Sequence, residues 1–312
     1  MKIVVVDHVY LEEEHIQQLQ AIGEPQIFRE PPESDEELKR RIQEAEVVIV
    51  GWSHLSKEII DSAADLKMIS IWATTCHYAD LDAARRRGIV VTHVPGYGTE
   101  AVAEHTIALL LASARRLVSA DKHVREAKFD WRPFTGVELA GKTLGLVGTG
   151  AIGCRVAEMA KAFKMRILSF DIAPNTKKAQ DIGFEYVDLG TLLRESDIVS
   201  VHVTLNSTTE RLIGRKEIEQ MKNAAIVINT SQGKVIDERA LVDALRSHKL
   251  SYAGLDVFEE EPMAPGNPLF ELDNVVLSPH VGFCTIEAVK RCTDICIDNV
   301  RKFSEGQLQN VC

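Results

Sequence analysis

The sequence lacks the features that would assign it to a membrane, to nucleic acid or to an export route. Its longest apolar run is the six residues Ile107–Ala112, whereas a bilayer-spanning helix needs about 20. The 36 basic residues are outnumbered by 46 acidic ones, and they form no stripe that could grip a phosphate backbone. The apolar run Ile3–Val6 ends at Asp7 and is shorter than the core of a signal peptide. We therefore expect a cytoplasmic protein that binds neither membranes nor nucleic acids.

Cysteine is sparse and follows no framework spacing, which predicts reduced thiols in a chain of this size. The six cysteines are Cys76, Cys154, Cys284, Cys292, Cys296 and Cys312. Three of them could be combined with His280 as metal ligands, but no close-paired CxxC is present, and Cys292 and Cys296 lie one turn apart on a predicted helix. We therefore predict no bound metal.

What the sequence does contain is an alternation of short β-branched runs and helical segments over its 312 residues. This length suggests two domains, and continuously apolar strands separated by helices predict an α/β fold with parallel sheets. The predicted strands are Ile3–Val6, Val47–Val50, Met68–Trp72, Ile89–Thr92, Thr143–Val147, Arg166–Phe170, Ile198–Val203, Ala225–Asn229, Tyr252–Val257 and Val275–Leu277.

The longest uninterrupted helical pattern runs from Glu100 to about Ala127. It separates four of the predicted strands from the other six, so we place a domain junction at its start. Other predicted helices are Asp35–Ala45, Leu81–Arg87, Val156–Ala162 and Glu238–Ser247.

A glycine motif stands between a predicted strand and a predicted helix. Gly148, Gly150 and Gly153 form G-x-G-x-x-G directly after the strand Thr143–Val147. In dinucleotide-binding folds the first glycine permits the tight turn, the second lets the pyrophosphate approach, and the third packs the helix on the strand. The next predicted strand ends at Asp171, 18 residues beyond Gly153, where a carboxylate can accept a hydrogen bond from the ribose 2′-hydroxyl. This context predicts NAD as the cofactor.

The order of further segments resembles the D-2-hydroxyacid dehydrogenase family over nearly the whole chain. These segments are Gly88–Val91 with Pro95-Gly96, Glu100–Glu104, Gly141–Gly145, Asn229–Ser231, Ala253–Phe258 with Glu261-Pro262, and Ser278–Gly282. The resemblance implies a homodimer that transfers a hydride between NADH and a small-molecule 2-keto acid. It also implies a Rossmann-type NAD-binding domain (residues 100–285) inserted into a flavodoxin-like substrate domain (residues 1–99 and 286–312), with the C-terminal helix packed on the latter. The dimer interface is expected on the long helix that begins near Glu100.

The family uses an Arg, a Glu and a His in catalysis, and the last two correspond to Glu261 and His280. Imidazole titrates in the range useful for protonating an alkoxide, and a neighbouring carboxylate fixes its tautomer and raises its pKa. Where the family has the Arg, this chain has Gln232. An amide donates a weaker hydrogen bond than a guanidinium and brings no charge, so we expect an atypical substrate.

The substrate loop departs from the family as well. Thr75 stands where glycine is usual, which restricts positive φ, and Cys76 and His77 add polar side chains beside it. A covalent role for Cys76 or His77 finds no other support in the sequence. Phe283 replaces a small residue and would reduce the space beside the substrate or the nicotinamide.

The resemblance to the family extends to the residues that bind the cofactor. The residues expected to bind NAD are Gly148, Gly150, Ala151, Ile152, Gly153, Asp171, Thr204, Thr209, Thr230 and Asp256. The leading hypothesis is an NAD-dependent dehydrogenase that uses His280, Glu261 and Gln232. The alternative is an NAD(H)-binding regulator, similar to a corepressor, with weakened catalysis.

Overall fold

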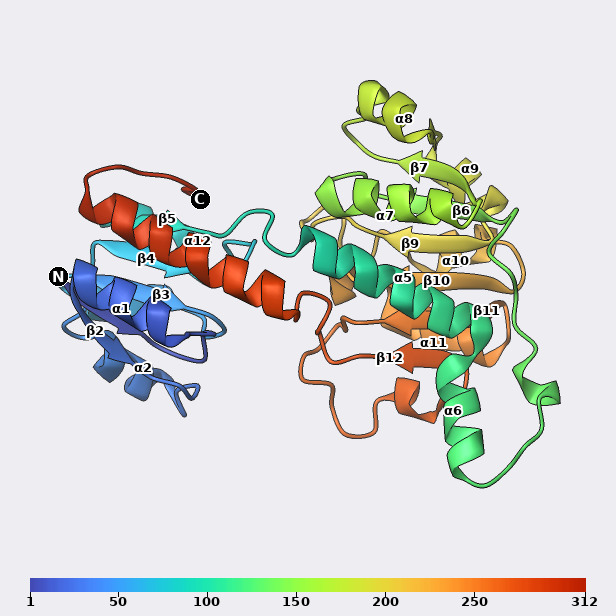
Figure 1. Ribbon diagram of the computed structural model, residues 1–312, viewed down its shortest axis with the longest axis horizontal. Coiled ribbons are helices and arrows are strands. Elements are labelled where there is room, and N and C mark those ends of the chain that lie inside the picture. The colour runs from blue at the N-terminus through green and yellow to red at the C-terminus, as the bar shows by residue number, and fades with distance from the viewer. The chain divides into compact units, whose positions relative to one another are not determined.

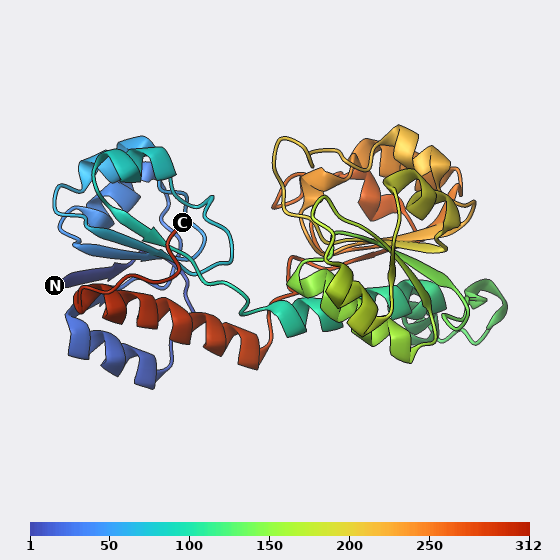
Figure 2. The ribbon, with the colours of Figure 1, turned by 90° about the horizontal axis from the view of Figure 1, so that it is seen from above.

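The computed structural model describes all residues from 1 to 312, and the chain divides into two compact units (Figures 1 and 2). The N-terminal unit consists of Met1–Gly98 and Cys284–Cys312, and the central unit is Thr99–Phe283. The chain thus leaves the N-terminal unit once and returns to it once. No helix is long and apolar enough to cross a membrane.

The N-terminal unit contains a five-stranded parallel sheet in the order β2-β1-β3-β4-β5, which is the flavodoxin-like order. The strands are β1 (Lys2–Val5), β2 (Glu24–Ile27), β3 (Val47–Val50), β4 (Met68–Ile71) and β5 (Val90–Thr92). The helices are α1 (Glu13–Ile22), α2 (Asp35–Ile42), α3 (Lys57–Ser62), α4 (Leu81–Arg86) and α12 (Ile286–Ser304).

Helix α12 completes this unit from the far end of the sequence. Its residue Thr293 accepts a hydrogen bond from the indole of Trp72 (2.9 Å) and donates one to the carbonyl of Tyr10 (2.6 Å). In Figure 1, α12 (red) lies beside α1 (blue). The C-terminal helix therefore packs on the N-terminal unit, as the resemblance implies.

A disulfide joins Cys76, in the loop after β4, to Cys312. The prediction that all six cysteines are reduced is therefore wrong for these two, whereas the other four are free. The C-terminal tail, which ends at Cys312, runs antiparallel to β5. The amide of Cys312 donates a hydrogen bond to the carbonyl of Val91 (2.9 Å), and the amide of His93 donates one to the carbonyl of Asn310 (3.0 Å). Because β5 neighbours β4 in the sheet, this pairing brings the tail to the loop after β4. A separation of 236 residues leaves no local signal for the pairing in the sequence.

The central unit contains a seven-stranded parallel sheet in the order β12-β11-β10-β9-β6-β7-β8. Numbered from β6, this is the Rossmann order 3-2-1-4-5-6 with one strand added. The strands are β6 (Thr143–Val147), β7 (Arg166–Phe170), β8 (Glu185–Tyr186), β9 (Ile198–Val201), β10 (Ala225–Asn229), β11 (Leu250–Leu255) and β12 (Val275–Leu277). All ten predicted strands are present, and the edge strands β2 and β8 were missed.

Helices cover both faces of this sheet (Figure 2). One face packs against α5 (Thr99–Arg115) and α7 (Ala151–Ala162), and the other packs against α9 (Leu189–Glu195), α10 (Arg215–Gln220) and α11 (Glu238–Arg246). The remaining helical segments are α6 (Leu117–Arg125), α8 (Thr176–Ile182), η1 (Arg132–Phe134), η2 (Gly233–Val235) and η3 (Pro268–Glu271).

The predicted single helix from Glu100 to about Ala127 is in fact two helices. Arg116 adopts a left-handed conformation (φ 52°), which ends α5 and starts α6. This leaves α12, with 19 residues, as the longest helix.

Exposed apolar side chains are concentrated between α6 and the segment after η1. Phe129 is 99% exposed and Trp131 is 79% exposed. Leu117, Val118, Val124 and Val137 are also exposed in this segment. We refer to residues 117–137 as the α6–η1 arm.

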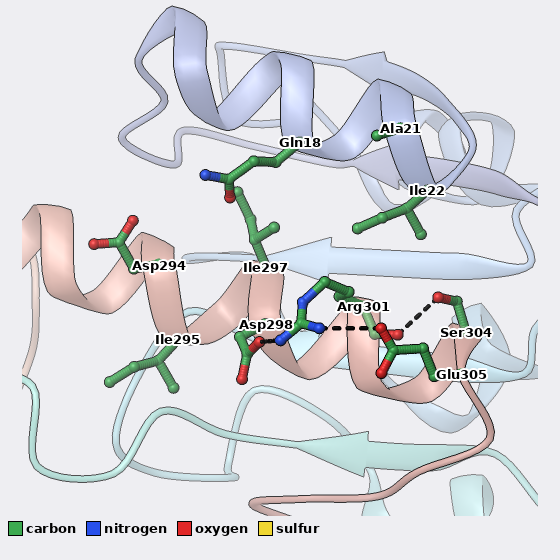
Figure 3. A pocket seen from close by; sticks show the side chains of 10 residues that line it. All are labelled: Gln18, Ala21, Ile22, Asp294, Ile295, Ile297, Asp298, Arg301, Ser304 and Glu305. Carbon is green, nitrogen blue, oxygen red and sulfur yellow. Dashed lines mark hydrogen bonds and ion pairs between the residues drawn. The ribbon is translucent and has the colours of Figure 1, made fainter.

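A groove of about 950 Å³ lies between α1 and α12 in the N-terminal unit (Figure 3). Ile22 and Ile297 line it, and Arg301 pairs with Asp298 and Glu305 beside them. None of the residues expected to bind cofactor or substrate lines this groove.

Candidate active site

The three glycines of the predicted pyrophosphate turn play different steric roles. Gly148 has a φ of +99°, and a Cβ there would lie 2.6 Å from the carbonyl oxygen of His202. A Cβ on Gly153 would lie 2.2 Å from the carbonyl oxygen of Gly148. Gly150, by contrast, has nothing within 4 Å of such a Cβ. The turn is therefore packed at its first and third glycines and open at its second.

This open position lies at the start of α7, where Gly150 is the N-cap. Ala151 and Ile152 occupy the first two helical positions, whose amides have no acceptor within a helix. Such amides, together with the helix dipole, form an anion site. The geometry therefore fits the pyrophosphate of a dinucleotide.

Asp171 follows β7 and faces this turn. Its Oδ2 accepts hydrogen bonds from the amide (2.7 Å) and the hydroxyl (2.9 Å) of Thr149, and its Oδ1 accepts one from the amide of Ala173 (2.9 Å). Burial raises the pKa of this carboxyl, but the hydrogen bonds outweigh burial and leave the pKa below its ordinary value. Asp171 is therefore an ionised acceptor beside the glycine turn, where the ribose is expected.

The other expected cofactor residues follow β9, β10 and β11, whose carboxyl ends lie at the same sheet edge as the glycine turn. Thr209 donates its hydroxyl to the carbonyl of Thr204 (2.7 Å). Thr230 is buried and pairs with the hydroxyl of Thr106 (2.7 Å). The structure thus gathers these residues from distant parts of the sequence.

Asp256, after β11, is 1% exposed and accepts hydrogen bonds from the hydroxyl of Ser278 (2.6 Å) and the amides of Val281 (3.0 Å) and Gly282 (2.7 Å). His105 on α5 lies 3.2 Å from the same carboxylate. Burial raises the pKa of Asp256, and these hydrogen bonds lower it below its ordinary value. Asp256 therefore ties down the segment that carries His280.

His280 and Glu261 form a hydrogen-bonded pair. Nδ1 of His280 lies 2.6 Å from Oε2 of Glu261, and Oε1 of the same carboxylate accepts the amide of Phe258 (2.9 Å). The hydrogen bond that His280 donates to Glu261 is the main cause that raises the pKa of His280 above its ordinary value of 6.5, against the opposing effect of burial. For Glu261, burial raises the pKa, while the hydrogen bonds from His280 and Phe258 bring it below its ordinary value. The carboxylate holds Nδ1, which leaves Nε2 as the nitrogen able to exchange a proton.

Gln232 lies in the loop between β10 and η2, next to the loop that carries Glu261. A Cβ on Gly233 would lie 1.9 Å from the carbonyl oxygen of Phe258, so these two backbones are in direct contact. The carbonyl of Gln232 accepts the side-chain amide of Asn229 (3.0 Å). No hydrogen bond in the structure uses the side-chain amide of Gln232, which is available as a neutral donor.

The loop after β4 in the N-terminal unit holds the expected substrate residues. The hydroxyl of Thr75 lies 2.7 Å from Nδ1 of His77, and the rings of His77 and Tyr78 stack at 4.3 Å. Cys76 offers no thiol to a substrate, because its sulfur is bonded to Cys312. The expectation of a polar thiol at this position is therefore wrong.

Phe283 belongs to the central unit and lies beside His280. The two rings meet edge to face at a centroid distance of 6.4 Å. A bulky ring thus flanks the imidazole, at a position where the family more often has a small residue.

A model of the NAD-binding domain of the D-isomer specific 2-hydroxyacid dehydrogenases matches residues 107–282. The chain belongs to this family. A glyoxylate reductase from Thermofilum pendens is 42% identical over 283 residues, which cover 89% of this chain and 84% of the relative.

Solved structures of the family share both units. A D-lactate dehydrogenase from Aquifex aeolicus, in complex with NAD and lactic acid, superposes with a TM-score of 0.85 and 30% identity over 98% of this chain and 96% of its own. An acyclic imino acid reductase, in complex with NADPH and D-Arg, superposes with a TM-score of 0.91 and 33% identity over the whole of both chains. The chain is accordingly an NAD-dependent oxidoreductase acting on CH–OH groups.

Several residues at the site escaped prediction. Thr149 lies inside the glycine motif, where only the glycines carried a signal. His105, Ser278 and Tyr186 reach the site through packing of α5, β12 and β8. No local pattern in the sequence marks His105 or Tyr186, whereas Ser278 stands in the segment Ser278–Gly282 that carries the resemblance but was given no role of its own.

Proposed function

We propose that this family member reduces a carbonyl compound with NADH, or oxidises the corresponding alcohol, with His280 as the acid–base residue and Glu261 as its partner. The 2.6 Å contact between His280 and Glu261 carries this proposal. Because a pure sensor of NADH has no need of a carboxylate-supported imidazole, the pair favours an enzyme over a regulator.

In this proposal, one group of residues binds the cofactor and another transfers the proton. Gly150, Ala151 and Ile152 hold the pyrophosphate, and Asp171 accepts from the adenine ribose. By the family resemblance, Thr204 and Thr209 would flank the adenosine and Thr230 would lie near the nicotinamide ribose. Asp256 would accept from the carboxamide while it holds the His280 segment. Bound NADH supplies a hydride to the carbonyl carbon. Protonated His280 then gives its Nε2 proton to the alkoxide oxygen, and Glu261 stabilises the charged imidazolium before this transfer.

The substrate differs from a simple 2-keto acid. In the family an Arg at the position of Gln232 holds the substrate carboxylate. A hydrogen bond to a charged group contributes about 1.5–3 kcal/mol, against about 0.5–1.5 kcal/mol for a neutral one. Replacing the guanidinium by an amide therefore costs a simple 2-keto acid about tenfold or more in kcat/KM.

By the family resemblance, substrate residues are also expected in the loop after β4 of the N-terminal unit. Thr75 and His77 present a hydroxyl and an imidazole that are already hydrogen-bonded to each other. These groups suit a substrate with a hydroxyl, amide or imine nitrogen rather than a bare carboxylate. The similarity to an acyclic imino acid reductase adds an imino acid to the candidates, a substrate that keeps its carboxylate but has nitrogen in place of the keto oxygen.

A steady-state assay with NADH across glyoxylate, pyruvate, keto amides, hydroxyketones and an imino acid tests the proposal. We expect turnover of at least one compound that is not a simple 2-keto acid, and poor turnover of pyruvate and glyoxylate. The Gln232→Arg variant should gain tenfold or more on pyruvate. Ordinary rates with pyruvate in the natural chain would refute the shift in substrate.

Two results separate the enzyme from the regulator. His280→Ala should abolish reduction while leaving the Kd for NADH nearly unchanged, because the imidazole is hydrogen-bonded to Glu261, which lies outside the glycine turn. Tight NADH binding with no turnover of any compound in the panel would instead support an NAD(H)-binding regulator with weakened catalysis.

The chain acts as a homodimer in this proposal, and the interface is the α6–η1 arm rather than the whole of the helical region that begins at Glu100. Phe129 is almost fully exposed there, and Trp131 is largely exposed. Six large apolar side chains on one arm exceed the scattered exposure of a monomer surface. A second copy of the arm would cover them.

A further inference from the structure

Asp171 is held by a chain of hydroxyl groups that continues beyond Thr149. The hydroxyl of Thr149 lies 2.9 Å from Oδ2 of Asp171 and 2.7 Å from the hydroxyl of Tyr186. The hydroxyl of Tyr186 in turn accepts the amide of Asn175 (3.1 Å). These contacts link the glycine turn, the end of β7 and the edge strand β8.

The direction of each hydrogen bond in this chain is determined by its two ends. An ionised carboxylate can only accept, so Thr149 must donate its proton to Asp171. Thr149 can then only accept from Tyr186, whose own oxygen accepts from the amide of Asn175. The protons therefore all point toward the carboxylate, an arrangement in which each hydrogen bond polarises the next.

This chain restricts how the carboxylate can turn. Oδ2 receives two donors from Thr149 and Oδ1 receives the amide of Ala173, and the amide of Ile172 also interacts with the carboxylate. The Asp171 side chain is only partly buried, so a ribose hydroxyl can still reach the carboxylate from solvent. Any rotation that moved the carboxylate away from this position would break the bonds to Thr149.

Resting on the proposed role of Asp171 as the ribose acceptor, we propose that Thr149 and Tyr186 are positioning residues that make Asp171 select NADH over NADPH. A carboxylate held in place accepts the 2′-hydroxyl in a single geometry, and it cannot turn away from a 2′-phosphate, whose charge of about −2 repels it. Loss of the hydroxyl chain frees the carboxylate. The affinity for NADH then falls, and the penalty against NADPH becomes smaller.

The test is to measure the Kd of NADH and the Kd of NADPH by titration calorimetry in the absence of substrate. The Tyr186→Phe variant should lower the ratio of the NADPH Kd to the NADH Kd by about threefold to tenfold, the loss expected for one neutral hydrogen bond. The Thr149→Val variant should lower the ratio at least as much, because it removes the bond to Asp171 itself. Thr149→Ser keeps the hydroxyl and should restore the ratio.

Tyr252→Phe is the matched control. It removes another tyrosine hydroxyl of the central unit, one that donates to the carbonyl of Asp273 (2.9 Å) and is remote in the fold from Asp171. It should leave the ratio unchanged. Thermal unfolding of each variant without cofactor distinguishes a general loss of stability from a loss of selection.

The Asp171→Ala background provides the decisive comparison. There, Tyr186→Phe should have no further effect on the ratio, because its influence passes through the carboxylate. The proposal is overturned if Tyr186→Phe and Thr149→Val weaken both cofactors equally or change neither. It is also overturned if Tyr186→Phe changes the ratio as strongly in the Asp171→Ala background as in the natural chain.

Discussion

The Nδ1 atom of His280 lies 2.6 Å from Oε2 of Glu261, and the other oxygen of that carboxylate is bonded to the amide of Phe258. Because Gly233 packs directly on Phe258, the acid–base pair is braced by the loop that carries Gln232. The amide of Gln232, where the family has a guanidinium, thus stands on the loop that packs beside this pair.

The pH dependence of reduction should follow His280. Its pKa is raised above 6.5, so the protonated form required for reduction persists above that pH and is lost as the pH rises through the shifted pKa. Glu261→Gln removes the negative charge and should move this alkaline limb of kcat/KM to lower pH. Oxidation needs the neutral imidazole and should show the opposite limb. An unmoved limb in Glu261→Gln would show that the carboxylate does not support the imidazolium.

The second and third glycines of the motif should separate cofactor binding from stability. Gly150→Ala should unfold like the natural chain, since its new methyl group meets no protein atom within 4 Å, but it should raise the Kd for NADH at least tenfold by blocking the pyrophosphate. Gly153→Ala places a methyl group 2.2 Å from the carbonyl oxygen of Gly148 and should cost about 1–3 kcal/mol of stability. Thermal unfolding and NADH titration of both variants check this, and a destabilised Gly150→Ala would contradict it.

The disulfide should stabilise the N-terminal unit alone. Cys312→Ser frees the loop after β4 and should lower the free energy of unfolding by about 2–5 kcal/mol, measured by denaturant titration under non-reducing conditions. The Kd for NADH should not change, because the expected cofactor residues all belong to the central unit. Cys284→Ser, at an exposed free cysteine, is the control. Equal stability of the two variants would mean that the disulfide contributes nothing.

The α6–η1 arm should determine the oligomeric state. A Phe129→Glu, Trp131→Glu double variant places charges where apolar side chains are exposed, and it should shift the protein from dimer to monomer in light scattering coupled to size exclusion. Phe270→Glu, at a half-exposed phenylalanine on η3, should remain dimeric. If the natural chain is already monomeric at micromolar concentration, the proposed dimer interface is wrong.

Elements at the centres of the two sheets could be predicted because they are buried on both faces and therefore read as apolar runs. The edge strand β2 contains Glu24, Pro25 and Gln26, and β8 has only two residues, so neither carries such a pattern. The left-handed residue Arg116 separates α5 from α6. No glycine or proline marks this position in the sequence, and the residues on both sides favour a helix.

The residues of the candidate site also fall into those that the sequence could predict and those that it could not. The glycines, Asp171, Glu261 and His280 stand in local motifs, so their positions were available from the sequence. The hydrogen bond between the hydroxyls of Tyr186 and Thr149 depends on the pairing of β8 with β7. The disulfide of Cys76 depends on Cys312, which is 236 residues away. Contacts between distant segments leave no trace in a single sequence.

The return of α12 to the N-terminal unit has a consequence for biosynthesis. As a chain leaves the ribosome, β1 to β5 emerge first, yet Ser70 and Trp72 have partners on α12 that emerge only after the whole central unit. Residues 99–283 are contiguous and can complete their fold as they appear. The first unit to emerge is therefore the last to finish, and an arrested or truncated chain would expose the face of β4 that α12 covers.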